Sequence, residues 1–121
     1  MRISAVILRV ADVAEAKSFW SEKVGLGVVF EVPNFVFLDG GGTQLVLSHI
    51  DDGVTDESMT EVVLEVDDVR DSFAALSERG VPFEVELRPV NSDGERQLLA
   101  AHFRDPDGHY ASLTGWVAET A

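Results

Sequence analysis

The sequence predicts an α+β fold, in which two βαβββ modules form a cupped mixed sheet with helices on its outer face. Two observations support this prediction. The phrase AVILRVADV at residues 5–13 returns as EVVLEVDDV at residues 61–69, and the same order of strand and helix signals follows each copy. Because a repeat of this length indicates a repeated structural unit, we expect a single domain, residues 1–121, with modules at about residues 1–56 and 57–121.

Each copy of the phrase predicts a strand and then a helix. Alternating apolar residues give each strand one buried face; they are Val6, Leu8 and Val10, then Val62, Leu64 and Val66. Asp12 and Asp68 follow at the N-cap position, each with an acidic residue three positions later. The apolar residues at helical spacing are Val13, Ala16, Trp20 and Val24, then Val69, Phe73 and Leu76. We expect Gly25 and Gly80 to end the two helices.

Three further strand signals follow each predicted helix. In the first module they cover residues 28–32, 34–38 and 43–49, with a glycine-rich hairpin turn at residues 40–42. In the second module they cover residues 83–87, 98–104 and 110–114, and the segment NSDGER at residues 91–96 is expected to be a loop. DPDG at residues 105–108 has the residue types of a type I turn.

Composition limits the kinds of partner. Nine Lys and Arg oppose 22 Asp and Glu, which gives a formal net charge of −13. Such acidity argues against nucleic acid, favours solubility and would attract a cationic ligand. No apolar run approaches the roughly 20 residues of a membrane span, so we expect a cytoplasmic protein without a membrane partner. The chain has no cysteine, which excludes disulfides, thiolate catalysis and Cys-ligated metals.

The arrangement resembles the vicinal oxygen chelate superfamily, the fold of glyoxalases, bleomycin-resistance proteins and extradiol dioxygenases. The resemblance rests on AVILRVADVAEAKSFWSEKVGLG, EVVLEVDDVRDSFAALSERGV and HFRDPDGHYASL, and it covers nearly the whole chain. It implies paired βαβββ modules around a ligand cup, commonly in a homodimer. It does not imply one reaction, because the fold hosts many.

The resemblance also implies where metal ligands would stand. Metal-dependent members carry His or Gln at the position of Ala5, His at that of Glu61 and Glu at that of Ser112, and glyoxalases add Glu near Val46. Ala5 and Val46 have no donor atom in their side chains, and Ser112 is a weak neutral ligand. Because a catalytic metal needs about three protein ligands, the sequence predicts no metal site and no cofactor.

Alternation places a set of side chains on the strand faces away from the helices, where a ligand would bind. The predicted ligand-binding residues are Arg9, Phe35, Phe37, Val46, Glu61, Val63, His102, Tyr110, Ser112 and Trp116. Aromatic members of this set could stack on a flat ligand, and core packing is the alternative for each. Alternation alone does not determine which of Phe35 and Phe37 faces inward.

Glu61 is the candidate catalytic residue, because a carboxylate in a partly apolar cup can act as a general base. A solvated or Arg-paired carboxylate is the alternative. Arg9 and Glu65 occupy equivalent places in the two copies of the phrase, and we expect an ion pair between them. Anchoring of a polar ligand by Arg9 is the other possibility.

The leading interpretation is a metal-independent small-molecule-binding protein that resembles the antibiotic-sequestering bleomycin-resistance proteins. A glyoxalase-like lyase or isomerase, or a dioxygenase of the same superfamily, remains an alternative. A third possibility is an accessory or regulatory binding protein. The expected partners are a cationic or aromatic small molecule and a second copy of the chain. The loss of metal-ligand residues favours binding over catalysis, and the sequence does not identify the ligand.

Overall fold

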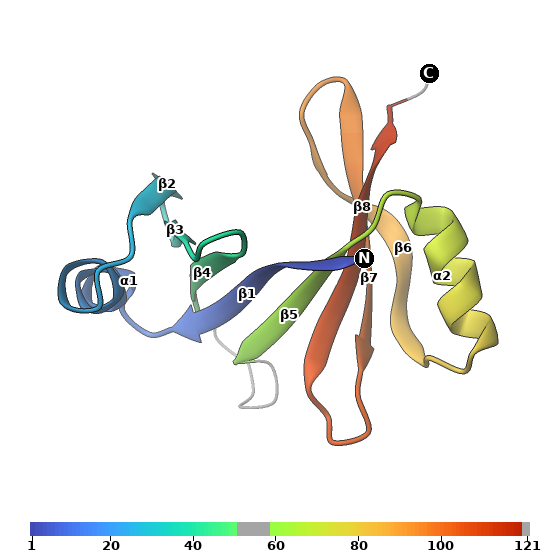
Figure 1. Cartoon of the computed structure of the whole chain (residues 1–121), viewed down its shortest axis with the longest axis horizontal. Helices are drawn as coiled ribbons and strands as arrows, with labels where there is room; N and C mark the ends of the chain where they lie inside the picture. The colour runs from blue at the N-terminus through green and yellow to red at the C-terminus, as the bar shows by residue number, and fades with distance from the viewer. Residues whose placement is uncertain (51–58, 120–121) are drawn as a thin grey trace. The chain divides into compact units, whose positions relative to one another are not determined.

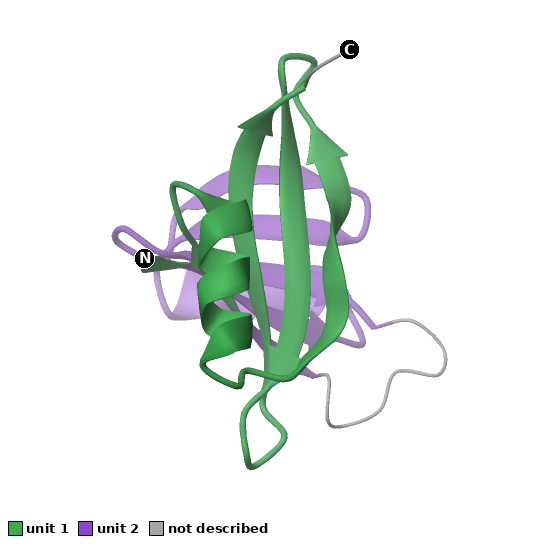
Figure 2. Ribbon diagram, turned by 90° about the vertical axis from the view of Figure 1, so that its right-hand side faces the viewer, with its two compact units in different colours: residues 1–3, 63–121 green, residues 4–62 purple. Residues whose placement is uncertain are grey.

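A computed structural model describes residues 1–50 and 59–119 of the chain (Figure 1). The chain divides into two compact units, unit 1 with Met1–Ile3 and Val63–Ala121, and unit 2 with Ser4–Val62 (Figure 2). The mixture of strands and helices confirms the predicted α+β class. The expected module boundary at residues 56 and 57 lies outside the described residues, and the cupped arrangement and the single domain stay predictions.

In its described residues, unit 2 holds a four-stranded part of the sheet, a helical segment and the first residues of a further strand. Its strands are β1 (Arg2–Val10, from Ser4 onward in this unit), β2 (Val28–Val32), β3 (Phe35–Asp39) and β4 (Gln44–His49), in the order β2-β3-β4-β1. The neighbours β2, β3 and β4 pair antiparallel, whereas β1 pairs parallel with β4. The sheet of unit 2 is therefore mixed, as predicted.

Unit 1 repeats this plan, and its second, third and fourth strands are longer than those of unit 2. Its strands are β5 (Thr60–Glu65, of which the first three residues belong to unit 2), β6 (Phe83–Ser92), β7 (Arg96–Arg104) and β8 (Tyr110–Ala118), in the order β5-β8-β7-β6. The helix α2 (Val69–Glu78) lies against one face of this sheet, as Figure 2 shows in green.

The two helices begin as the sequence predicts. The Asp12 carboxylate accepts a hydrogen bond from the backbone N–H of Glu15 at 3.0 Å, and Asp68 accepts one from Asp71 at 3.0 Å. Each cap satisfies one of the N–H groups that a first helical turn leaves without a partner. Gly25 and Gly80 follow the helices with φ of 103° and 92°, a left-handed conformation that glycine adopts without steric cost.

The first helical segment differs from the prediction after its first turns. The α-helix α1 covers only Val13–Lys17, and the π-helical segment η1 (Ser18–Lys23) continues it. Val24 N–H bonds to the Phe19 carbonyl, five residues back, at 2.9 Å. This wider turn rotates Val24 away from the core, where regular helical spacing had placed it, and Val24 is 51% exposed.

Among the described residues, no helix has the length and apolar content to cross a membrane.

Each unit has its core between its helix and its sheet. In unit 2, the buried Val36, Leu38 and Leu47 pack with Trp20 and other apolar residues of the helical segment. In unit 1, the buried core residues are Val66, Val69, Leu99 and Leu113, with Phe73 and Leu76 of α2 packed against them. Apart from Val24, the apolar residues predicted at helical spacing pack in these cores, because the periods of helix and strand put them there.

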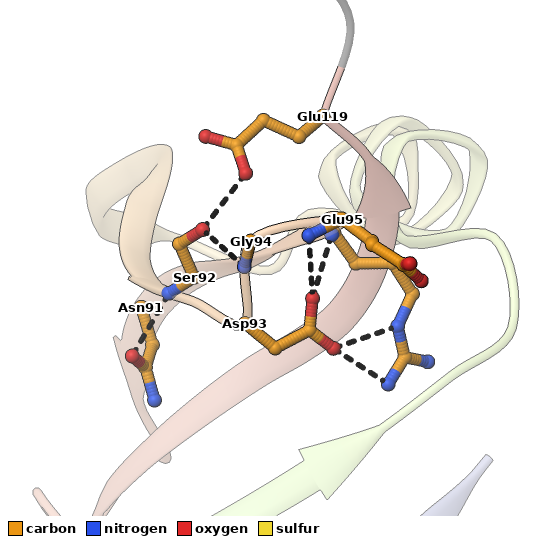
Figure 3. A network of polar contacts seen from close by, with 7 residues as sticks. Asn91, Ser92, Asp93, Gly94, Glu95 and Glu119 are labelled. Atoms are coloured by element: carbon orange, nitrogen blue, oxygen red, sulfur yellow. Dashed lines mark hydrogen bonds and ion pairs between the residues drawn. The ribbon is translucent and has the colours of Figure 1, made fainter.

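The last three strands of unit 1 extend beyond the predicted ranges. The expected loop at residues 91–96 shrinks to residues 93–95, because Ser92 and Arg96 belong to strands. Figure 3 shows the reason. The Asp93 carboxylate accepts the backbone N–H groups of Glu95 at 3.0 Å and Arg96 at 2.7 Å, and the Arg96 guanidinium donates to its other oxygen at 3.1 Å and 3.2 Å. The hydrogen bond from the Arg96 backbone contributes most to lowering the pKa of the Asp93 carboxyl, and the other bonds add to it. Together these bonds hold a tight turn.

Candidate functional site

The sheet face opposite the helix, which we call the helix-free face, is where the sequence places a ligand. In unit 2 the strand register brings its side chains into rows. One row runs across the strands through Phe30, Phe37, Val46 and Ile7, and the next through Val32, Phe35, Ser48 and Arg9. The side chains between these positions, such as Val36, Leu38 and Leu47, pack on the helix side.

Three phenylalanines gather on the helix-free face of unit 2. The Phe37 ring centroid lies 5.8 Å from that of Phe30 and 6.5 Å from that of Phe35, and the planes of the Phe35 and Phe37 rings differ by 22°. Phe30 is 57% exposed and Phe35 is 42% exposed. Phe35 and Phe37 face the same side because residues two apart in a strand point the same way. The sequence left open which of Phe35 and Phe37 faces inward, and in the structure both lie on the helix-free face.

Arg9 and Glu61 form an ion pair at one end of these rows. Arg9 Nη2 lies 2.9 Å from Glu61 Oε1, with only 7% of the Glu61 side chain and 21% of the Arg9 side chain exposed. The predicted pair of Arg9 with Glu65 is wrong, because Glu65 pairs with Arg2 at 2.9 Å. The physical reason is register: Arg9 N–H donates to the Met59 carbonyl at 2.8 Å, which puts Arg9 beside the start of β5.

The helix-free face of unit 1 has a different character. The rings of His102 and Tyr110 stack with centroids 5.2 Å apart and an interplanar angle of 8°. The Arg104 guanidinium lies 4.8 Å from the centre of the Tyr110 ring and donates to both carboxylate oxygens of Glu84 at 3.2 Å. Stacking and cation–π contacts of this kind fix the orientation of the rings.

The remaining predicted residues of unit 1 lie around this stack. Ser112 is directly opposite His102 in the register of β7 and β8 and is buried. Val63 is partly buried on β5. Trp116 lies farther along β8, where the Arg96 guanidinium approaches its ring to 4.7 Å. Trp116 is thus packed by a side chain of its own unit.

Each unit therefore holds half of the predicted set. Unit 2 holds Arg9, Phe35, Phe37, Val46 and Glu61, and unit 1 holds Val63, His102, Tyr110, Ser112 and Trp116. The sequence reasoning missed several neighbours of these residues, among them Phe30 and Arg88. The two-residue turn at residues 33–34 fixes the pairing of β2 with β3, and following that register would have placed Phe30 opposite Phe37. No comparable signal in the sequence indicates Arg88, because its position depends on a register shift in β6.

The family model described as "Glyoxalase/Bleomycin resistance protein/Dioxygenase superfamily" matches residues 2–113. The chain belongs to this superfamily. A comparison with curated proteins finds no match.

Solved structures agree on the fold of this superfamily member. A superfamily member from Vibrio splendidus 12B01 is similar with a TM-score of 0.76 at 18% identity, over 96% of this chain and 98% of that chain. A hypothetical protein from Bacillus halodurans C-125 is similar with a TM-score of 0.73 at 15% identity, over 99% of this chain and 96% of that chain. At such identities the likeness concerns the fold alone.

The residues present do not fit the metal that metal-dependent members of the superfamily hold. Of the four corresponding positions, Ala5 and Val46 have no donor and Ser112 offers a neutral hydroxyl. Glu61 is the one carboxylate, and its Oε1 already accepts from Arg9. Within residues 1–50 and 59–119, no three His, Cys, Asp or Glu side chains come together as a metal site would require.

Proposed function

We propose that the protein binds a small organic molecule without a metal ion, in the manner of a bleomycin-resistance protein that sequesters an antibiotic. The observation that carries this proposal is the ion pair of Arg9 with Glu61, whose atoms are 2.9 Å apart. Glu61 stands where the resemblance implies a metal-ligating histidine. A guanidinium there already supplies the positive charge that a carboxylate would seek from a metal ion.

The helix-free face of unit 2 supports an aromatic ligand. Phe30 and Phe35 expose about half of their surface, and Phe37 lies between them. Phenylalanine faces carry partial negative charge, so they suit a ligand that is both planar and cationic. The net charge of −13 supports a cation through the long-range field. Glu61 and Glu65 are each paired with an arginine, so this attraction comes from the whole surface.

Calorimetric titration with bleomycin and with planar cationic antibiotics tests the proposal. We expect binding that weakens as salt is raised, and roughly tenfold weaker binding for Phe35→Ala, since one good aromatic contact contributes about 1 kcal/mol or more. Phe19→Ala is the matched control, because Phe19 is 48% exposed but lies on the helical segment. Equal losses for both variants, or no binding of any of these compounds, would contradict the proposal.

Elemental analysis of protein purified without chelators tests the metal-independent part separately. We expect no stoichiometric Ni, Zn, Fe or Mn, because the ligand positions lack donors. One tightly held ion per chain that is lost in Glu61→Ala would overturn this part and favour an enzyme of the superfamily.

We also propose a homodimer. Strand β2 is an edge strand of the unit 2 sheet, and Val28, Val29, Phe30 and Val32 on it are 40–57% exposed. An apolar edge strand of this kind is a hazard in solution unless something covers it, and a second copy of the chain can do so. Light scattering at micromolar concentration should therefore give twice the monomer mass of 13.2 kDa. The monomer mass would refute the dimer without touching the ligand proposal.

A further inference from the structure

Arg88 makes two contacts on the helix-free face of unit 1. Its Nη1 donates to the Ala100 carbonyl at 2.8 Å and lies 3.1 Å from Nδ1 of His102. Leu87 packs against the core of unit 1, so the adjacent Arg88 points to the opposite face. The register of β6 against β7 shifts between Val85 and Arg88, and such bulges re-aim a side chain.

The Arg88 contact determines where His102 carries its hydrogen. A guanidinium has N–H donors only, and it stays protonated in proteins. The Nδ1 atom of His102 must therefore accept the hydrogen bond through its lone pair. An imidazole that accepts at Nδ1 is neutral and carries its hydrogen at Nε2. Protonation of Nδ1 would set two donors against each other, so the charged ring cannot keep this bond.

The plane of the same ring is fixed by Tyr110. The two rings are stacked at 5.2 Å and 8°, and Arg104 holds the tyrosine through its own contact at 4.8 Å. Ring orientation and hydrogen position are thus set by different neighbours. Neighbours that fix both the orientation and the tautomer of an imidazole are typical of a histidine whose ring nitrogen makes a specific hydrogen bond.

We infer that Arg88 is a positioning residue that holds His102 as the neutral Nε2–H tautomer, so that the Nε2 atom is a hydrogen-bond donor. Any group that meets Nε2, whether of the protein or of a ligand, has to accept a hydrogen bond.

Nuclear magnetic resonance of the ¹⁵N-labelled full chain tests the tautomer directly. Long-range ¹H–¹⁵N correlations at neutral pH should show His102 with a bare Nδ1 and a protonated Nε2, and His102→Gln assigns its signals against those of His49 and His109. Arg88→Met should give a mixture of both tautomers, whereas Arg88→Lys, which keeps a donor, should restore one. Arg70→Met is the control, because it removes an exposed arginine on α2.

Two results would overturn the inference: a hydrogen on Nδ1 of His102 in the unaltered protein, or an unchanged pure tautomer in Arg88→Met. The signals of His49 and His109 report in the same spectrum whether each variant is folded.

Discussion

The helix-free faces of the two units differ far more than their helix-side cores. Both cores are built of valine and leucine under a helix that starts at a capping aspartate, Asp12 in unit 2 and Asp68 in unit 1. On the other side, unit 2 carries phenylalanines and a buried ion pair, whereas unit 1 carries a His–Tyr stack flanked by arginines. A repeated module thus keeps the residues that fold it, and its second face is available for different chemistry.

The largest expected effects come from the cores, where the units are alike. Leu38 in unit 2 and Leu113 in unit 1 are both fully buried. Leu38→Ala and Leu113→Ala should each lower the free energy of unfolding by about 3–4 kcal/mol, because each removes buried apolar surface and leaves a cavity. Denaturant unfolding measures this loss. A cost below about 1 kcal/mol for either variant would show that its core collapses around the gap and that the units are not equivalent.

The two ion pairs should respond very differently. Arg9→Met leaves the buried Glu61 charge without this partner and should cost about 3 kcal/mol. Arg2→Met breaks a pair of the same length in unit 1, but 59% of the Arg2 side chain is exposed, so the loss should stay below about 1 kcal/mol. The double variant Arg9→Met/Glu61→Leu should recover most of the loss. Equal costs for Arg9→Met and Arg2→Met in urea unfolding would contradict this ranking.

The helix caps should give equal and smaller effects. Asp12→Ala and Asp68→Ala each remove a carboxylate that accepts a backbone N–H at 3.0 Å, which should cost about 1 kcal/mol. Asp→Asn at either position keeps an acceptor and should cost less. Thermal unfolding of the four variants measures the difference. A much larger loss at Asp12 would show that the π-helical segment after α1 makes that helix more dependent on its cap.

The smallest expected effect is the pH dependence of stability at the DPDG turn of unit 1. In this turn the Gly108 N–H bonds to the Asp105 carbonyl at 3.0 Å, as predicted for a type I turn. The hydrogen bond and charge of Asp105 raise the pKa of His109 above its usual 6.5. This contribution to stability is complete below pH 6.5 and is lost as the pH rises through the raised value. His109→Ala should remove the corresponding decline in unfolding free energy. A variant with the same decline as the unaltered protein would contradict the assignment.

The same Asp105 responds at acidic pH. Hydrogen bonds from the backbone and side chain of His109 lower the pKa of Asp105 below its usual 3.8, so its contribution is present above pH 3.8 and is lost as the pH falls through the lowered value. Both groups are exposed, which keeps these effects small.

The sequence was sufficient to predict the helix side of each unit and which residues face the other side, and insufficient to predict the contacts among those residues. Alternating apolar residues and the capping aspartates are local signals, and they led directly to the cores. The partner of Arg9 follows from the backbone hydrogen bond between Arg9 and Met59, which no local pattern reveals. The equivalence of Arg9 and Glu65 in the repeat suggested a pair, but equivalent positions in two modules need not be adjacent. Arg88 was not predicted because a bulge in β6 determines the direction of its side chain.

The carboxylate of Asp93 that closes the β6–β7 turn has a consequence for the order of folding. A three-residue connection costs little chain entropy, so β6 and β7 can pair early. In unit 2, the parallel pair of β1 and β4 must bring together segments separated by residues 11–43, which is slow by comparison. We therefore expect Asp93→Asn to slow refolding in proportion to its loss of stability, and Ser48→Ala on β4 to speed unfolding instead. Stopped-flow kinetics with both variants measures this, and a change in the unfolding rate alone for Asp93→Asn would exclude the hairpin as the site where folding starts.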